Sequence, residues 1–214
     1  MDLAERSVRD FVDTVASDAP APGGGSVAAL EASIGAALTG MVACLTQGRK
    51  KYAEFAENAA TVQAHAEDLQ KRLLSLMDED SEAFNRVSAA FSLPKDTDEE
   101  KAARSAAIQE GLKGCTRTPL EMMRLCEEAI SLAIDFLEKG FNRSSASDLG
   151  VAFLSLKSAM QGAWLNVLIN LSSIKDPDFV RENRGIGEAI LQRSLPLAEE
   201  GYAKVLAIVQ PQQM

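Results

Sequence analysis

The sequence predicts an all-α protein of one domain, and three of its features carry that prediction. Aromatic residues make up only 5% of the 214 residues, which disfavours a β-sandwich because strands prefer aromatic and β-branched side chains. Apolar residues recur near the 3.6-residue period of a helix, without the two-residue alternation of a strand. Two long segments, 27–48 and 149–172, are apolar on nearly every side and rich in Ala, Gly and Ser.

We expect these two segments to be the buried central helices of a bundle of about seven or eight helices, with residues 1–214 as one domain. Segment 27–48 is also long enough to span a bilayer. Glu31 and the Ser and Thr content of this segment favour a buried helix instead, so no membrane partner is expected.

The first half of the chain predicts two further helical stretches. Residues 2–17 show amphipathic spacing, and residues 54–92 show heptad-like spacing that fits one long helix or two in line. Between them, the Pro and Gly residues of segment 19–25 predict a loop. Ser26 is expected to cap the helix that follows this loop.

The second half is divided by turn and cap signals. Thr97 followed by Glu100 predicts a capping box. Helices are expected over 98–115 and 118–138, separated near Pro119, with Gly140 after the second. A loop at 175–178 precedes a last predicted helix over 187–208.

Charge and cysteine usage exclude several classes of function. The formal net charge is −9 without a Lys/Arg stripe, so no nucleic-acid partner is expected. The three cysteines lack CxxC spacing and are predicted to be buried free thiols, which fits a reducing compartment, the cytoplasm. His65 is the only histidine, which disfavours a histidine-based metal site. The first six residues lack the charge pattern of a signal peptide.

The glycine-rich loop is the first candidate site. Gly23, Gly24 and Gly25 would let the backbone come close to a ligand. Ser26 follows them, and the helix behind supplies partial positive charge at its N-terminus. Ligand binding and a purely structural loop both fit this pattern.

The second candidate is Asp80, within an acidic run in segment 54–92. Its i−4 and i+3 neighbours are Leu76 and Ala83, so it falls on the apolar face of the helix. A carboxylate there must find a partner or raise its pKa, and carboxylates with raised pKa values serve as general acids and bases. The neighbouring Asp78, Glu79 and Glu82 are interpreted as solvated, whereas for Asp80 both interpretations stand.

A third group of polar residues accompanies segment 149–172. Asn166 and Asn170 are four apart on an apolar helix, where unpaired amides cost on the order of 1–3 kcal/mol each, so helix contacts or a substrate must satisfy them. Asn142 and Asp148 lie at the polar start of the same segment, and Asp148 could also simply cap its helix. We expect the glycine loop, segment 142–148 and Asn166 to line one cleft.

Taken in order, four segments resemble the formiminotransferase-cyclodeaminase family, specifically its cyclodeaminase domain and the free-standing bacterial methenyltetrahydrofolate cyclohydrolases. The segments are residues 21–29 (APGGGSVAA), 80–84 (DSEAF) followed by 93–95 (LPK), 147–152 (SDLGVA) and 162–170 (GAWLNVLIN).

The resemblance implies an all-helical domain that self-associates as a homodimer or larger homo-oligomer. It also implies a tetrahydrofolate substrate and no metal or redox cofactor. It implies hydrolysis of 5,10-methenyltetrahydrofolate to formyltetrahydrofolate in one-carbon metabolism. The alternatives are cyclodeamination of formimidoyltetrahydrofolate, with ammonia released, and a non-catalytic helical folate-binding or interaction protein. The transferase half of the bifunctional enzyme is absent from this chain, which favours the hydrolase.

The family's catalytic aspartate falls on Asp80. We assign substrate binding to the loop and amide residues of the expected cleft: Gly23, Gly24, Gly25, Ser26, Asn142, Asp148 and Asn166. Phe141 stands where the family usually has a glycine, which bears on the shape of the adjacent loop.

Overall fold

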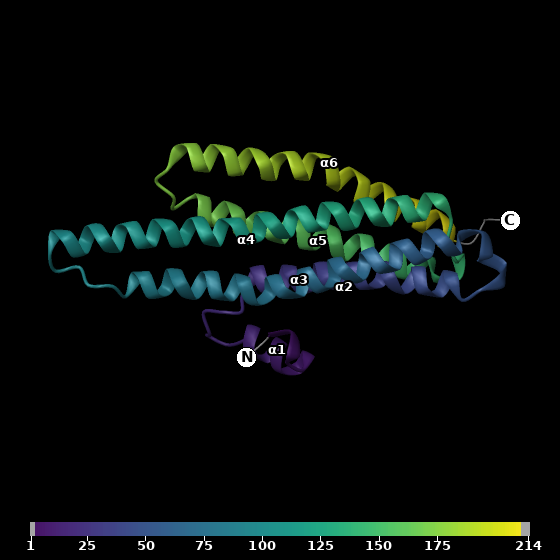
Figure 1. Ribbon diagram of the computed structural model, residues 1–214, viewed down its shortest axis with the longest axis horizontal. Coiled ribbons are helices and arrows are strands. Elements are labelled where there is room, and N and C mark those ends of the chain that lie inside the picture. Colours follow the sequence, from purple (N-terminus) through teal and green to yellow (C-terminus); the bar gives the residue numbers. More distant parts are fainter. Residues whose placement is uncertain (1–2, 211–214) are drawn as a thin grey trace.

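Helices account for almost all of the computed structural model, which describes residues 3–210 (Figure 1). The α-helices are α1 (Val8–Val15), α2 (Gly24–Gln47), α3 (Ala56–Phe91), α4 (Asp98–Lys139), α5 (Ala146–Leu171) and α6 (Pro177–Val209). Short 3-10 turns are η1 (Leu3–Glu5), η2 (Lys50–Phe55) and η3 (Arg143–Ser145). No strand occurs within these residues, so the all-α class is confirmed. Residues 1–2 and 211–214 of the domain predicted over 1–214 lie outside the described residues.

The helix count of seven or eight is wrong, because the described chain has six α-helices. Pro119 was expected to divide two helices but lies inside the continuous α4. A proline removes the hydrogen bond to the carbonyl four residues earlier, which here belongs to Cys115. The side-chain amide of Asn170 donates to that carbonyl at 2.9 Å, so α5 satisfies the acceptor that the proline leaves open.

Helix α6 also begins ten residues earlier than predicted. Asp176 caps it by accepting from the backbone N–H groups of Asp178 and Phe179, and Pro177 occupies the first helical position, where its missing N–H costs nothing. We had interpreted this cap-and-proline signal as a loop. In contrast, the capping box of Thr97 and Glu100 at the start of α4 is confirmed.

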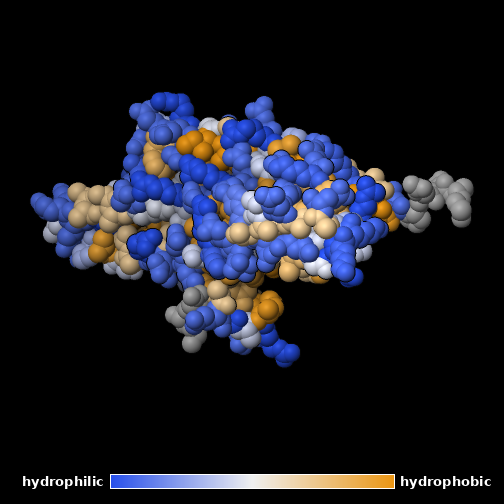
Figure 2. Space-filling view, turned by 45° about the vertical axis from the view of Figure 1, so that its right-hand side comes forward, coloured by the Kyte–Doolittle hydropathy of each residue, from blue (hydrophilic) through white to orange (hydrophobic). Residues whose placement is uncertain are grey.

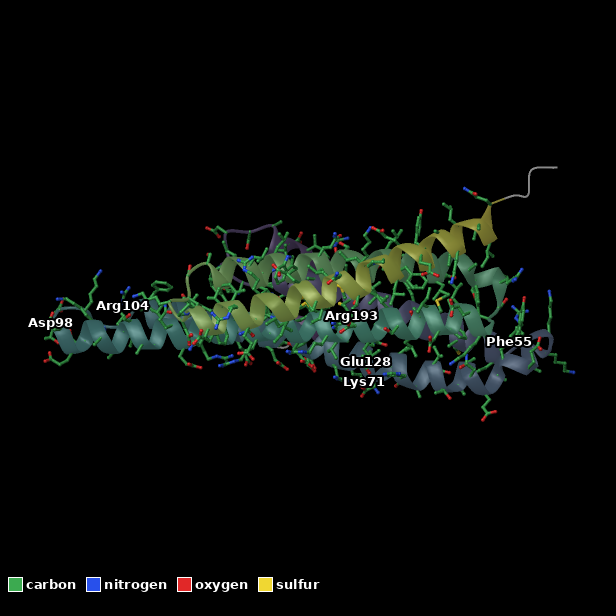
Figure 3. The ribbon with its side chains drawn as sticks, turned by 90° about the horizontal axis from the view of Figure 1, so that it is seen from above. Phe55, Lys71, Asp98, Arg104, Glu128 and Arg193 are labelled. Carbon is green, nitrogen blue, oxygen red and sulfur yellow. The ribbon has the colours of Figure 1, made fainter. Side chains whose placement is uncertain are left out.

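The long helices pack side by side along one axis, with α2 against α3 and α5, and α4 against α3, α5 and α6. Figure 1 shows α3 in front of α2 and α4 in front of α5, while α1 stands apart from the bundle. In Figure 3, Asp98 and Arg104 mark one end of the bundle and Phe55 marks the other.

Helices α2 and α5 run antiparallel in close contact. A Cβ on Gly162 would lie 3.3 Å from the Cβ of Ala28, and a Cβ on Gly35 would lie 2.6 Å from Cγ of Leu156. Small residues on both helices therefore permit the close approach predicted from their composition. The start of α2 consequently lies beside the end of α5, and the end of α2 beside the start of α5.

The prediction that both helices are buried all round is wrong for one side of each. Ile34 and Met41 of α2 are each 46% exposed, and Leu165 and Ile169 of α5 are each 67% exposed. Cys44 is likewise exposed on α2, whereas Cys115 and Cys126 are buried as predicted. Helix α2 is long and apolar enough to cross a membrane, but half of its most apolar window is buried inside the bundle.

Candidate functional site

Asp80 lies in the C-terminal half of α3, on the side that faces α2. Its neighbours Leu76 and Ala83 are buried, as predicted, and Asp80 itself is half-buried. Phe84, one turn further along the helix, is 41% exposed. Asp80 therefore lies at the border between the core and an opening to solvent.

The glycine-rich N-terminus of α2 lies against the carboxylate of Asp80. Gly23 is the N-cap and supplies no side-chain hydrogen bond, so α2 begins at Gly24. The first N–H groups of a helix have no acceptor within it, and those of Gly24 and Gly25 are among them. Ser26 was predicted to be the cap, which is wrong, because the helix starts two residues earlier and Ser26 lies fully buried within the first turn.

Ser26 instead joins α2 to α3. Its hydroxyl lies 3.0 Å from the carbonyl oxygen of Met77, 3.2 Å from Oδ2 of Asp80 and 3.1 Å from the hydroxyl of Ser81. The hydroxyl can donate only one proton and accept others, so these contacts form a shared network. This network fixes the Asp80 carboxylate against the first turn of α2.

Gly25 leaves the space that the carboxylate occupies. A Cβ on Gly25 would lie 2.3–2.5 Å from the carboxyl atoms of Asp80, whereas a Cβ on Gly23 would meet nothing within 4 Å. Glycine is therefore required at position 25 for contact reasons, not for its conformational freedom. Any larger residue there would displace Asp80.

Burial raises the pKa of the Asp80 carboxyl above its ordinary value, and hydrogen bonds from the side chain and backbone of Ser26 partly oppose this shift. Burial disfavours the charged form, while donors at a helix N-terminus favour it. The carboxyl is thus held in an environment suited to both giving and taking a proton. Its own burial, and after that the negative charge of Asp80, raise the pKa of the nearby Cys115 thiol to about 11, so that thiol stays protonated at neutral pH.

Helix α5 brings two amides to the opposite side of the opening. Asn166 donates to the carbonyl of Gly162 at 2.9 Å, and Asn170 donates to the carbonyls of Asn166 and Cys115. A Cβ on Gly24 would lie 3.6 Å from Nδ2 of Asn166, so the amide stands directly across from the glycine loop. Helix contacts thus hold both NH2 groups, which leaves the two amide carbonyls to accept hydrogen bonds from a ligand.

These groups line one pocket of about 300 Å³. Polar groups from three helices converge in it, while apolar side chains form its walls, which is the common character of small-molecule sites. The lining residues are Pro20, Ala21, Gly23, Gly24, Gly25, Asp80, Phe84, Cys115, Asn166, Ile169 and Asn170.

A larger hollow of about 810 Å³ lies between the N-terminal segment and α3. Its walls include Asp78, Glu79 and Glu82, and Asp78 accepts a hydrogen bond from the backbone N–H of Leu3 at 2.9 Å. The sequence suggested that Asp78 is solvated, and this interpretation is wrong. Asp78 instead anchors the N-terminal segment through this hydrogen bond. We place the candidate site in the smaller pocket, because there the Asp80 carboxyl, whose pKa is raised, meets the amides of α5 and the first N–H groups of α2.

Asn142 and Asp148 do not reach this pocket within the chain, so the prediction of one cleft is wrong at this point. The backbone N–H of Asn142 donates to the hydroxyl of Thr46, and its side chain donates to the carbonyl of Leu45, at the far end of α2. Asn142 also accepts from the N–H of Ser144 and caps η3. The reason is the antiparallel pairing of α2 and α5, which separates their two N-termini by the length of a helix.

Phe141 lies at the same remote end. It is buried against Phe136, with ring centroids 6.0 Å apart. Gly140 before it has a φ of 113° and closely approaches the ring of Phe55. Phe141 thus fills the core at the end of α4 and does not shape the pocket around Asp80 within one chain.

Sequence reasoning did not assign Phe84, Ile169 or Cys115 to the site, and it left open whether Asn170 meets a substrate or a neighbouring helix. The usable signal was the spacing of Pro119 four residues after Cys115, which demands a donor from elsewhere. Only the tertiary structure identifies that donor as Asn170. Among residues 3–210, no group of three or more His, Cys, Asp or Glu side chains is placed to hold a metal ion.

Fold and site together define a helical-bundle protein whose candidate pocket holds one carboxylate, that of Asp80, among amides and glycines. Comparison with known proteins identifies the family to which this helical-bundle protein belongs. The formiminotransferase-cyclodeaminase family model matches residues 7–185, and the chain belongs to that family.

Two relatives differ in how much of their length the chain covers. A methenyltetrahydrofolate cyclohydrolase from Methylorubrum extorquens is 43% identical over 199 residues, which are 93% of this chain and 95% of the relative. A formimidoyltransferase-cyclodeaminase from Sus scrofa is 38% identical over 194 residues, and the chain spans only 35% of that relative. A solved structure, formiminotetrahydrofolate cyclodeaminase from Thermotoga maritima, aligns with a TM-score of 0.80, 26% identity and 97% coverage of both chains.

Proposed function

We propose that this protein is an enzyme that hydrolyses 5,10-methenyltetrahydrofolate to formyltetrahydrofolate. The observation that carries the proposal is the Asp80 carboxyl, which the first turn of α2 holds in a pocket with two amides. The relative that is 43% identical along nearly its whole length carries the name of this activity. The reaction belongs to one-carbon metabolism.

The chemistry needs one group that handles protons. The methenyl substrate carries a cation delocalised over two nitrogens, and water adds to the carbon between them. Asp80 accepts a proton from the attacking water and stabilises the cation beforehand. When the carbon–nitrogen bond breaks, the protonated carboxyl can return a proton to the departing nitrogen. A pKa above the ordinary aspartate value suits this two-way role.

The other pocket residues would bind and orient the substrate. The N–H groups of Gly24 and Gly25 donate toward oxygen atoms, and the carbonyls of Asn166 and Asn170 accept from ring N–H groups. We assign Gly23 and Ser26 to the same function through the shape and anchoring of the loop. Phe84 and Ile169 supply apolar walls against which a planar ring can pack.

Cyclodeamination of formimidoyltetrahydrofolate is the second candidate, because the relatives from Sus scrofa and Thermotoga maritima carry names of that activity. The same carboxyl, when protonated, would give its proton to departing ammonia. We further propose that the protein works in the cytoplasm as a homodimer, without a metal or redox cofactor. A non-catalytic folate-binding or interaction role is the remaining alternative.

An absorbance assay of the purified protein with each folate in turn separates these functions. Loss of the methenyl absorbance, faster than in a protein-free control, supports the hydrolase. Formation of methenyl absorbance from formimidoyltetrahydrofolate with release of ammonia supports the deaminase. No change with either folate would overturn both enzymatic assignments and support the non-catalytic role.

A further inference from the structure

The first turns of α4 extend past the loop that joins α5 to α6, as Figures 1 and 3 both show. A hollow of about 410 Å³ lies there, lined by α4, by the loop before it and by the α5–α6 loop. Segment 93–95, one of the segments that carry the family resemblance, contributes Lys95 to its wall. The pocket around Asp80 makes no use of this hollow.

The hollow is basic, although the chain is acidic. Four of the residues that line it are cations: Lys95, Lys101, Arg104 and Lys175. No Asp or Glu occurs among the described residues of its wall, even though the whole chain has 31 of them against 22 Lys and Arg. Four like charges around this basic hollow repel one another, so they favour a bound ligand that carries several negative charges.

The chain itself neutralises little of this positive charge. Lys95 and Lys175 form no ion pair within residues 3–210. Lys101 lies 2.8 Å from Asp98, whose side chain is 94% exposed. An exposed pair of this kind contributes little free energy, so a carboxylate of a ligand can take the place of Asp98.

Two sets of hydrogen bonds hold the walls of the basic hollow in place. Arg104 donates through Nε and Nη2 to the carbonyl of Phe91 at 3.2 and 2.9 Å, and its guanidinium lies 5.7 Å from the centre of that ring. Nη1 of Arg104 has no partner within the described chain and can donate to an anion. Gln109 donates to the carbonyl of Ser173 and accepts from the backbone N–H of Lys175. Fixed walls lower the entropy cost of binding.

The basic hollow and the pocket around Asp80 lie on the same side of α4. Lys101 and Ile108 line the hollow, and Cys115 lines the pocket. These three residues are spaced seven apart, which is almost two full turns, so they share one side of the helix. At 1.5 Å per residue, Ile108 lies about 10 Å and Lys101 about 21 Å from the level of Cys115.

Helix α3 carries two exposed aromatic rings along the same path. Of the phenylalanines in the described chain, only Phe84 and Phe91 are exposed, at 41% and 53%. Phe84 lines the pocket with Asp80, and Phe91 lies under Arg104 of the basic hollow. The face seen in Figure 2 is mostly hydrophilic, with apolar residues in small groups. Two exposed rings between an acid and a group of cations suit a ligand whose aromatic part is followed by negative charges.

We propose that the basic hollow binds the carboxylates of the glutamate tail of the substrate, so that the enzyme prefers folates with several glutamates. This inference rests on the proposed folate substrate. With the reacting carbon at Asp80, the p-aminobenzoyl ring packs against Phe84 and the tail runs towards Phe91 and Lys101. Each further γ-linked glutamate adds one carboxylate and at least about 3.5 Å of chain. A tail of several glutamates therefore covers the distance of about 21 Å along α4.

A nucleic acid fits these observations less well than a short acidic tail. The four cations surround a hollow of about 410 Å³ and do not form a stripe along the surface. The net charge of −9 repels a long polyanion. The compact group of cations instead matches a few carboxylates that lie close together.

The first test compares 5,10-methenyltetrahydrofolate with one and with three glutamates. The wild-type KM should be at least about tenfold lower for the triglutamate, because its extra carboxylates form charge-assisted hydrogen bonds. The double variant Lys95→Gln/Lys175→Gln should raise the KM for the triglutamate towards that for the monoglutamate. Equal KM values for the two substrates in the wild-type protein would overturn the proposal.

The matched control is Lys50→Gln/Lys51→Gln, which removes the same charge from exposed positions on η2, away from both the pocket and the hollow. This variant should keep the full wild-type ratio of the two KM values. Loss of the ratio in the control as well would mean that the net charge of the protein, and not the basic hollow, recognises the tail.

The second test uses the length of the tail as a ruler. With substrates that carry one to six glutamates, KM should fall over the first additions and then become constant once the tail reaches Lys101. Added salt should raise KM more for the longer substrates, because it screens the charges of the basic hollow. A KM that continues to fall with every added glutamate would contradict a site of fixed length.

The third test measures binding without turnover. In titration calorimetry, p-aminobenzoyl-triglutamate should bind the wild-type protein more tightly than p-aminobenzoyl-glutamate does, and Lys95→Gln/Lys175→Gln should lose this difference. Tighter binding of inorganic tripolyphosphate or of a short single-stranded oligonucleotide would overturn the choice of a glutamate tail. If the wild-type protein turns over neither folate, the proposed function fails, while calorimetry still decides whether the basic hollow binds the tail.

Discussion

The side-chain amide of Asn170 donates a hydrogen bond to the carbonyl of Cys115 at 2.9 Å, and Pro119 is the reason that this carbonyl needs a donor. A proline that ought to weaken α4 thereby fixes α5 against it, beside the pocket. Asn170, a residue of the candidate site, is thus held in place by the backbone hydrogen bond that is missing in α4.

We expect Asn170→Ala to destabilise the protein by about 1–3 kcal/mol, the usual cost of a buried acceptor left without its donor. Pro119→Ala restores a backbone N–H to position 119, so Asn170→Ala should cost less in that background. Urea unfolding of the four proteins forms a double-mutant cycle that measures the coupling. Equal costs in both backgrounds would show that the amide does not replace the missing helical bond.

Asp80→Asn should fold, bind folate and lose at least about 10²-fold in kcat, the lower range for a general acid–base group. The amide keeps the size of the side chain and can still accept from Ser26, but it cannot carry charge or a proton. Glu82→Gln is the matched control, because Glu82 is exposed and lies two residues away on the same helix. Asp78 does not serve as a control, since it anchors Leu3. Wild-type turnover by Asp80→Asn would refute the catalytic assignment.

The pKa of Asp80, raised above its ordinary value of 3.8, predicts how stability depends on pH. Above this raised pKa the folded protein carries the full cost of a buried charge, so Asp80→Asn should be the more stable protein at pH 7. As pH falls through the raised pKa towards 3.8, the folded state binds the proton first, and the wild-type protein recovers stability relative to the variant. Urea midpoints of both proteins between pH 4 and pH 7.5 measure this convergence, and a difference that widens towards acid would contradict the raised pKa.

The same pKa shift predicts the pH dependence of the hydrolysis. A general base must be ionised, so kcat/KM should fall as pH falls through a value above 3.8. The residual activity of Asp80→Asn should lack this limb of the profile. A wild-type profile that is flat down to pH 4 would mean that Asp80 does not act as the base.

Gly25→Ala should abolish most of the activity while the helical circular dichroism spectrum is retained. Its Cβ would overlap the carboxylate of Asp80, which must then move away from the first turn of α2. Gly185→Ala on α6 is the control, because a Cβ there also has open space and Gly185 does not line the pocket. Equal activity of the two variants would show that the close contact between Gly25 and Asp80 is not needed for turnover.

The local physics of the chain decides much of this architecture from the sequence alone. Helical spacing placed Asp80 inward on α3, small residues predicted the close pairing of α2 and α5, and Thr97 with Glu100 predicted the cap of α4. These features depend on residues within a few positions of one another or on side-chain size. The sequence also grouped Gly23, Gly24, Gly25 and Asn166, and all four line the candidate pocket.

The tertiary structure decided everything that depends on how distant segments meet. The continuity of α4 through Pro119 required a donor from α5, and the separation of Asn142 from Gly24 required the antiparallel direction of two helices. The outward stripe of α2 is apolar like its buried sides, so composition alone could not distinguish them. The hydrophobic effect favours burial of every apolar helix surface. Only the packing geometry shows which of these surfaces the chain leaves exposed.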